Sequence, residues 1–259
     1  MASRIPLIAG NWKMHKTPAE AGTFARNLLE KMPEDPAVDV VLCPPFPAIP
    51  AVATKLEGSR IAWGAQNMHW EAEGAYTGEV SAPMLQAMGC RYVILGHSER
   101  RVQFEETGEQ IRKKVKAALS CGLSPTYCLG EDLATRDAGD AEFFCLHQLA
   151  DGLEGLPWAD PKNLVVAYEP IWAIGAGRTA LPADTVAVIR LLREKIASWY
   201  GRVFAEQVRI LYGGSVTPDS IAGFMKEEQI DGVLLGGASL KLDSFIEVVR
   251  TAADVKRRI

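Results

Sequence analysis

Several patterns that mark other classes of protein are absent from this chain. It has no run of 18 apolar residues, which a membrane-spanning helix needs. It also has no Gly-x-x-x-x-Gly-Lys-Ser/Thr segment, in which a nucleotide P-loop would cradle phosphates. The sequence therefore argues against a membrane partner and against a P-loop nucleotide enzyme.

Metal-binding and disulfide patterns are also missing. The chain has 5 cysteines, an odd number, and no two of them have Cys-x-x-Cys spacing. Its 4 histidines have no ligand spacing with nearby carboxylates or cysteines. We therefore expect reduced thiols and no bound metal. Residues 1–10 hold only a short apolar run, too short for a signal sequence, so we expect a cytoplasmic protein.

Charge and size narrow the class further. The formal net charge of −4 argues against a nucleic-acid partner, although a local positive site could still hold an anionic small molecule. The chain has 259 residues, of which 48% are hydrophobic, enough for one large core. We expect residues 1–259 to form a single domain.

Apolar runs alternate with amphipathic stretches along the whole chain. Eight runs read as strands: residues 5–10, 38–43, 60–65, 92–95, 125–129, 164–168, 208–212 and 232–235. Several are apolar almost throughout, as in parallel strands that are covered on both faces. Eight strand-helix units close naturally into a (β/α)8 barrel. A doubly wound open sheet is the alternative, but no Gly-x-Gly-x-x-Gly follows the first run.

The intervening stretches carry helix signals. Thr17, Pro18 and Glu20 supply a cap, a first-turn proline and a capping-box acid. One helical face then follows at Ala21, Phe24, Ala25 and Leu28, and a second in the last helix at Phe245, Val248, Val249 and Ala252.

Unusual polar residues fall at the carboxyl ends of the expected strands, where the chemistry of such barrels lies. Asn11 and Lys13 follow the first strand, His97 the fourth and Glu169 the sixth. A lone strand-end glutamate is more often a solvated side chain before a turn. Here a loop with Gly175 and Gly177 follows Glu169, which favours proton abstraction under a closing lid.

Glycine pairs after the last two strands predict a phosphate site. The segments are residues 213–215 (GGS) and 236–239 (GGAS). Glycine lets backbone N–H groups approach an anion, and a short helix beginning near Gly237 would point its positive end at it. Alone, each pair is more often a turn.

Five motifs together resemble the triosephosphate isomerase family, in the same order along nearly the whole chain. They are residues 9–14 (AGNWKM), 96–101 (GHSERR), 168–177 (YEPIWAIGAG), 212–216 (YGGSV) and 236–239 (GGAS). The resemblance implies interconversion of dihydroxyacetone phosphate and glyceraldehyde 3-phosphate through an enediolate, without a cofactor, in glycolysis and gluconeogenesis.

The resemblance also implies a role for each site residue. Glu169 would move the carbon-bound proton, neutral His97 would polarise the carbonyl, and Lys13, supported by Asn11, would supply positive charge. The residues implied to bind the phosphate or substrate are Asn11, Lys13, Gly175, Ser215, Gly236 and Gly237. The implied supporting residues are Glu99 near Lys13, Ile174 and Leu234 around Glu169, and Tyr212, which with Ser215 would latch the closed lid of residues 170–180.

A glycine-flanked loop at residues 74–79 looks exposed. Alone it could be a surface turn. The resemblance implies that it enters a neighbouring subunit and brings Thr77 toward Asn11, so that a homodimer completes each site.

Two other functions stay open at this point. Lys13 could form a Schiff base in an aldolase, since phosphate-binding barrels also host lyases. The chain could also be a barrel that binds sugar phosphates without catalysis.

Overall fold

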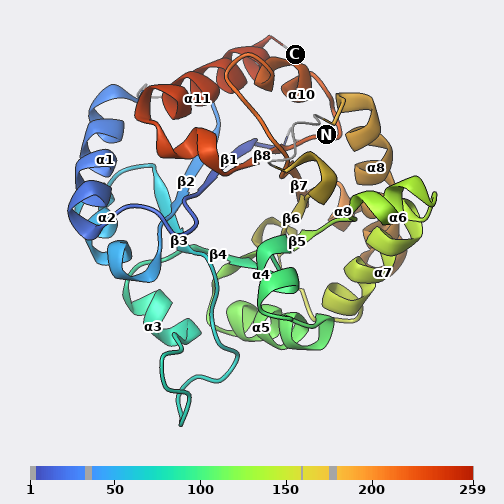
Figure 1. The fold of residues 1–259 in the computed structure, drawn as a ribbon, viewed down its shortest axis with the longest axis horizontal. Coiled ribbons are helices and arrows are strands. Elements are labelled where there is room, and N and C mark those ends of the chain that lie inside the picture. The colour runs from blue at the N-terminus through green and yellow to red at the C-terminus, as the bar shows by residue number, and fades with distance from the viewer. Residues whose placement is uncertain (1–3, 33–36, 159, 175–179, 259) are drawn as a thin grey trace.

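The computed structural model describes residues 4–32, 37–158, 160–174 and 180–258. Within these residues, eight parallel strands pair in chain order and β8 pairs with β1, so the sheet closes into a barrel (Figure 1). The strands are β1 (Leu7–Asn11), β2 (Asp39–Cys43), β3 (Ala62–Ala65), β4 (Tyr92–Leu95), β5 (Ser124–Leu129), β6 (Val165–Tyr168), β7 (Arg209–Tyr212) and β8 (Gly232–Leu235).

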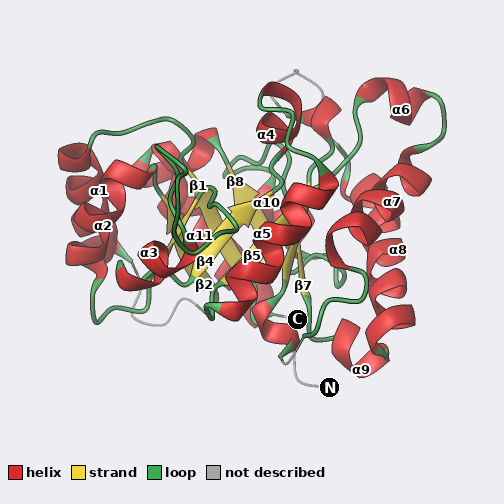
Figure 2. Ribbon diagram, turned by 90° about the horizontal axis from the view of Figure 1, so that it is seen from below, coloured by secondary structure: helices red, strands yellow, loops and turns green. Residues whose placement is uncertain are grey.

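Helices surround the barrel, and Figure 2 shows the strands enclosed between them. The α-helices are α1 (Pro18–Lys31), α2 (Ile49–Leu56), α3 (Ala82–Ala87), α4 (Ser98–Gln103), α5 (Gly108–Ser120), α6 (Leu133–Asp137), α7 (Ala141–Leu153), α8 (Pro182–Tyr200), α9 (Arg202–Ala205), α10 (Ile221–Met225) and α11 (Leu242–Arg257). Short 3-10 helices are η1 (Phe46–Ala48), η2 (Pro161–Asn163), η3 (Ile171–Ala173) and η4 (Gly237–Leu240).

The predicted (β/α)8 barrel is confirmed, and all eight expected strands form. β4 and β8 have the expected bounds, while the other strands begin or end one or two residues away from them. Several strand-helix units carry an additional helix, such as α4 and α5 after β4. Short helices such as α4 were not apparent in the apolar pattern because they bury few side chains.

Alternation along each strand divides the core into two parts, because successive side chains point to opposite faces. Side chains on one face fill the barrel interior: Leu7, Ala9, Val41, Cys43, Ile94, Cys128, Val165, Ala167, Leu211 and Leu234. Side chains on the other face, such as Ile8, Val166 and Ile210, belong to a larger cluster shared with the helices. Both faces are apolar, which explains the nearly continuous apolar runs.

The helix signals in the sequence are also confirmed. Thr17 caps α1, and its capping box with Glu20 is complete. The expected apolar faces of α1 and α11 are buried, from Ala21 to Leu28 in the first and from Phe245 to Ala252 in the second. These faces hold the helices on the barrel, because burial of apolar surface is the main favourable contribution to packing.

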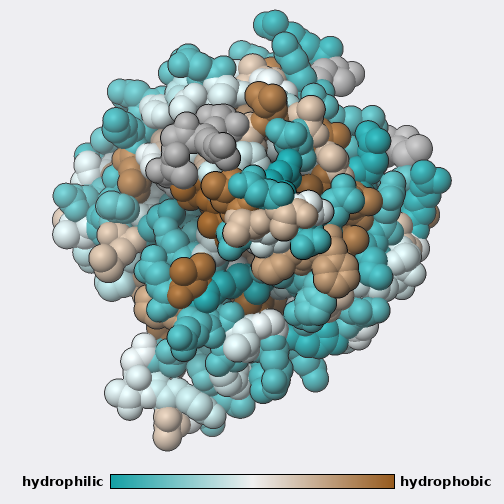
Figure 3. Space-filling model, turned by 45° about the vertical axis from the view of Figure 1, so that its right-hand side comes forward, coloured by the Kyte–Doolittle hydropathy of each residue, from teal (hydrophilic) through white to brown (hydrophobic). Residues whose placement is uncertain are grey.

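The surface drawn in Figure 3 is largely hydrophilic, with hydrophobic side chains gathered toward its middle. Among the described residues, no helix is both long enough and apolar enough to span a bilayer. All 5 cysteines are free, and Cys121 alone among them is not buried.

Candidate active site

The strand alternation directs two of the expected site residues into the mouth of the barrel. In β6, Val165 and Ala167 point inward, and Glu169 continues that face one residue beyond the strand. In β1, Leu7 and Ala9 point inward, and Asn11 is the next residue on that face. Glu169 is only 1% exposed, so it is not the solvated strand-end glutamate that a lone acid usually is.

Glu169 has two partners, both near the start of α4. Its Oε2 accepts a hydrogen bond from the backbone N–H of Ser98 at 3.0 Å. Its Oε1 lies 3.1 Å from Nε2 of His97. A buried carboxylate needs such partners, since an unpaired buried charge is strongly unfavourable. The structure thus brings together the two residues expected to perform acid-base chemistry.

The protonation of His97 follows from its place at the N-cap of α4. Its Nδ1 accepts the backbone N–H of Glu99 at 3.2 Å, so Nδ1 carries no proton. The ring proton of the neutral imidazole is then on Nε2, the atom that faces Glu169. This arrangement leaves the Nε2 atom of His97 directed at the mouth of the barrel, and the role of the ring in catalysis stays a prediction.

Lys13 is held by the side chains of Asn11 and Glu99. The backbone N–H of Lys13 donates to Oδ1 of Asn11 at 3.0 Å, and its Nζ lies 2.5 Å from Oε1 of Glu99. Lys13 has a left-handed backbone, with φ of 52°, which is uncommon for a residue other than glycine. Such strained conformations persist where the surroundings enforce them, often at functional sites.

Two glycines make room for these side chains. A Cβ at Gly213 would lie 2.7 Å from Cγ of Glu169, closer than packed carbon atoms approach. A Cβ at Gly236 would lie 3.4 Å from Cε of Lys13. Both glycines continue the inward faces of their strands, after Leu211 and Leu234. Larger side chains there would compete with Glu169 and Lys13 for the same space.

Within the first glycine segment, residues 213–215, the amide of Gly213 already has a partner. The N–H of Gly213 donates to the carbonyl of Tyr168 at 2.7 Å, so this amide continues the barrel ladder and does not face an anion. Other parts of the expected site are at the surface: Ser215 and Gly237 are exposed and Gly236 is half-buried. The short helix expected near Gly237 is present as η4.

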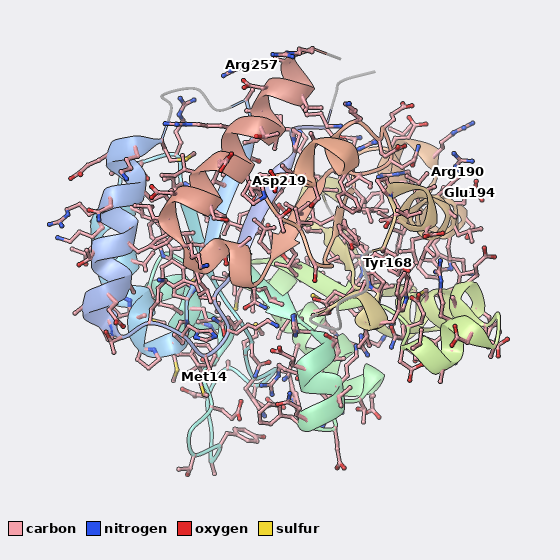
Figure 4. The ribbon with its side chains drawn as sticks, turned by 45° about the horizontal axis from the view of Figure 1, so that its top comes forward. Met14, Tyr168, Arg190, Glu194, Asp219 and Arg257 are labelled. Carbon is pink, nitrogen blue, oxygen red and sulfur yellow. The ribbon has the colours of Figure 1, made fainter. Side chains whose placement is uncertain are left out.

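The strand ends also anchor the segment that follows Glu169. The hydroxyl of Ser215 donates to the carbonyl of Ala173 at 2.8 Å, which ties the loop after β7 to η3. Glu131, which is fully buried, accepts hydrogen bonds at Oε1 from Trp172 (2.8 Å) and Tyr168 (3.1 Å). Tyr168 is labelled in Figure 4. Arg136 adds an ion pair to the same oxygen at 3.2 Å.

Four residues were expected to take part when the lid closes, and the structure describes three of them. Ile174 is half-buried at the end of η3, and Leu234 lies in the interior cluster of the barrel. The hydroxyl of Tyr212 is buried without a hydrogen-bond partner among the described residues, and burial raises the pKa of Tyr212 to about 12. Gly175 and the rest of residues 175–179 lie outside the described residues. The roles assigned to all four therefore stay predictions.

Sequence reasoning missed three contributors to the site. Ser98 donates its backbone N–H to Glu169, which no side-chain pattern reveals. Gln66 donates through Nε2 to the carbonyls of Lys13 and Cys43, both at 2.8 Å. Glu131 could have been found, because it is an acid two residues after β5, as Glu169 is one residue after β6. Glu131 lies two residues after Leu129, whose side chain faces the helices, so the side chain of Glu131 also lies on the helix side of the barrel.

The described residues near Glu169 offer neither a reactive cysteine nor a group of metal ligands. Burial, followed by the nearby carboxylate of Glu169, raises the pKa of the Cys128 thiol well above its usual value. This cysteine therefore stays a thiol, which is a poor nucleophile. Among the described residues, no group of three or more His, Cys, Asp and Glu side chains could hold a metal ion.

The loop at residues 74–79 is exposed as expected, and Figure 1 shows the chain between β3 and α3 protruding from the barrel. Thr77 is exposed, while the ring of Tyr76 packs on His69 with centroids 4.2 Å apart. Met14, labelled in Figure 4, is 94% exposed beside Lys13 in the sequence. The loop thus contributes nothing to the barrel core.

A (β/α)8 barrel that pairs a buried carboxylate with a neutral imidazole at its strand ends defines an acid-base enzyme. The family model for triosephosphate isomerase matches residues 6–252. The chain belongs to the triosephosphate isomerase family, and it is an isomerase.

Relatives that share about half of their residues with this chain support the same assignment. A triosephosphate isomerase from Carboxydothermus hydrogenoformans is 52% identical over 247 residues, covering 95% of this chain and 98% of that protein. One from Caldanaerobacter subterraneus subsp. tengcongensis is 50% identical over 246 residues, covering 95% and 99%. One from Symbiobacterium thermophilum is 49% identical over 255 residues, covering 98% and 100%. The alternatives of an aldolase and of a non-catalytic barrel are thereby set aside.

Proposed function

We propose that Glu169 is the base in this chain's interconversion of dihydroxyacetone phosphate and glyceraldehyde 3-phosphate, the isomerisation of its family. Glu169 takes a proton from one carbon of the substrate, which gives an enediolate, and returns it to the neighbouring carbon. The observation that carries this role is the 3.1 Å contact between its Oε1 and Nε2 of His97. It places a carboxylate and an N–H donor where they can act on adjacent atoms of one small substrate.

His97 is the electrophile in this proposal. Because Nδ1 accepts the N–H of Glu99, the Nε2–H group is available to polarise the substrate carbonyl. Nε2 then gives its proton to that oxygen and takes the proton of the neighbouring hydroxyl, so that the carbonyl moves from one carbon to the next and His97 ends as it began. A substrate oxygen would replace Glu169 as the partner of Nε2. The carboxylate would then be freed from His97 and could approach the substrate carbon.

Lys13 supplies the positive charge that an enediolate and a phosphate require. Its ion pair with Glu99 holds the ammonium in place, and the bond from its backbone to Asn11 fixes the start of the segment. Asn11 and Lys13 would both contact the substrate.

The phosphate would lie against the backbone of Gly236 and Gly237 at the start of η4, with Ser215 on the opposite loop. The exposure of Gly237 and of Ser215 supports this placement. So does the open space at Gly237, where no described residue lies within 4 Å of a Cβ built on this glycine. Gly175, together with Ile174, Leu234 and Tyr212, would complete the site when the lid closes over the substrate.

The chain would act as a single domain of residues 1–259 and as a homodimer in the cytoplasm. Exposed apolar side chains near the site support the homodimer, because they would be covered by a second copy: Met14, Tyr76, Met84, Val102 and Phe104. In that dimer Thr77 of each copy would approach Asn11 of the other. Five free cysteines fit a reducing compartment.

A coupled assay that follows the conversion of dihydroxyacetone phosphate tests the proposal. The purified chain should turn this substrate over, and the isosteric variant Glu169→Gln should lose turnover while it still binds inorganic phosphate. Full activity of Glu169→Gln would show that another group is the base.

A further inference from the structure

Lys16 has an unusual conformation in the segment that joins β1 to α1. Its backbone is left-handed, with φ of 72°, three residues after Lys13, where φ is 52°. Left-handed backbone is unfavourable for residues that carry a Cβ. Two such residues within one short segment imply that contacts elsewhere hold the segment in place.

The side chain of Lys16 makes those contacts. Its Nζ donates to the carbonyl of Leu240 at 3.0 Å. The same ammonium lies 4.7 Å from the ring centroid of Phe24 and 5.4 Å from that of Trp12. Positive charge over aromatic faces is favourable at such distances. Lys16 thus contacts the end of β1, helix α1 and η4 at once.

The contact with Leu240 matters because of the position of η4. Leu240 is the last residue of η4, and Gly237 is its first. The carbonyl groups at the end of a helix lack partners within the helix, and a lysine ammonium can satisfy them. The opposite end of the same short helix carries the amides that we assign to the phosphate. Lys16 therefore binds the far end of the element whose near end faces the substrate.

Lys13 also lies close to this part of the molecule. A Cβ built on Gly236, directly before η4, would be 3.4 Å from Cε of Lys13, an ordinary van der Waals distance. Both lysines of the β1–α1 segment are therefore near the phosphate region. Displacement of η4 relative to this segment would change the distance between Lys13 and the phosphate amides.

We infer that Lys16 is a positioning residue for the phosphate site, holding η4 against the segment that carries Lys13. This inference rests on the proposed function, because it assumes that Gly236 and Gly237 bind phosphate. Lys16 itself does not touch the substrate in this arrangement. Its ammonium keeps Lys13 and the two glycines at the spacing that a triose phosphate requires.

The surroundings of Lys16 fit this role better than that of a solvated surface lysine. Lys16 is half-buried, and burial lowers its pKa, an effect that the nearby carboxylate of Glu20 partly offsets. A lysine whose ammonium were fully in water would show no such loss of hydration.

Three variants separate the ammonium from the rest of the side chain. Lys16→Met keeps an aliphatic stem of similar length and removes the charge, whereas Lys16→Arg keeps the charge. Lys16→Gly removes the tether but relieves the left-handed backbone, so it is expected to fold even where Lys16→Met does not. Lys31→Met is the matched control, because Lys31 joins α1 to Asp243 of α11 through an exposed ion pair at 3.1 Å.

The measurements are kcat and KM for dihydroxyacetone phosphate, the dissociation constant of inorganic phosphate by calorimetry, and Tm. We expect Lys16→Met and Lys16→Gly to raise KM and the phosphate dissociation constant about threefold to tenfold, with a smaller change in kcat, as expected for the net contribution of one hydrogen bond. In Lys16→Arg and Lys31→Met, KM and the phosphate dissociation constant should stay within about twofold of the parent values.

Two results would overturn the inference. One is a lower Tm in Lys16→Met with KM and phosphate affinity unchanged, which would show a structural role alone. The other is an equal loss of phosphate affinity in Lys31→Met. A parent protein without turnover would instead refute the proposed function, and the phosphate titrations would still decide the role of Lys16.

Discussion

Nε2 of His97 lies 3.1 Å from Oε1 of Glu169. The base and the electrophile of the proposed reaction are therefore each other's partners in this structure. A substrate must separate them, since its carbonyl needs the Nε2–H group and its carbon needs the carboxylate. The backbone N–H of Ser98 holds the other oxygen of Glu169 and must also be released.

The first prediction concerns the length of the base. Glu169→Asp keeps the charge but withdraws the carboxylate by about 1 Å, a misplacement that can lower kcat on the order of 10²-fold. Phosphate affinity should change much less, because Glu169 does not contact the phosphate. Steady-state kinetics and a phosphate titration measure the two effects. Parent-level kcat with intact phosphate affinity would reject Glu169 as the positioned base.

The second prediction concerns the space that Gly213 leaves for Glu169. A Cβ in Gly213→Ala would lie 2.7 Å from Cγ of Glu169, so the carboxylate must move and kcat should fall on the order of 10²-fold. Gly22→Ala in α1 is the matched control, because its nearest contact would be an ordinary 3.6 Å. That control should keep its activity and gain up to about 1 kcal/mol in stability from helix propensity. Equal kcat in both variants would show that the glycine is not needed for the base.

The third prediction tests the proposed dimer. Deletion of residues 74–79 should give a folded monomer with low activity, because this exposed loop does not contribute to the barrel core. Sedimentation velocity gives the oligomeric state, and the coupled assay gives kcat/KM. If the deleted protein is monomeric and kcat/KM is unchanged, each site is complete within one chain.

The fourth prediction concerns a buried ion pair next to that loop. Lys114 in α5 contacts the carboxylate of Glu106, and its Nζ donates to Oδ1 of Asn67 at 2.9 Å. Lys114 and Glu106 are 4% and 6% exposed, so removal of Lys114 leaves the buried carboxylate with the longer contact to Arg100, at 3.4 Å. Lys114→Met should therefore lower the free energy of unfolding by about 3–5 kcal/mol.

The double variant Lys114→Met with Glu106→Leu is the control for this effect. It removes both charges, so it should recover much of the lost stability. Urea denaturation of the two variants and the parent measures the difference. If the double variant is as unstable as Lys114→Met, packing rather than an unpaired charge explains the loss.

Much of the site follows from strand alternation, which can be read without a structure. Val165 and Ala167 are small apolar residues two apart, and Glu169 continues that spacing beyond the strand. In a closed parallel barrel this face points to the interior, so the carboxylate must lie in the mouth. The same argument places Asn11, and it assigns Glu131 to the other face of the sheet. Backbone partners such as the Ser98 amide have no signature of this kind.

The eight strands, the barrel and the carboxyl-end position of the polar residues follow from the amino-acid sequence without a structure. These depend on local periodicity and on chain order, which are properties of the sequence alone. Three contacts could be found only in the folded chain: the close approach of Gly213 to Glu169, the hydrogen bond from Lys16 to Leu240, and the bonds of Trp172 and Tyr168 to Glu131. These contacts join residues from different strand-helix units, and the distances between their side chains exist only once the barrel has closed.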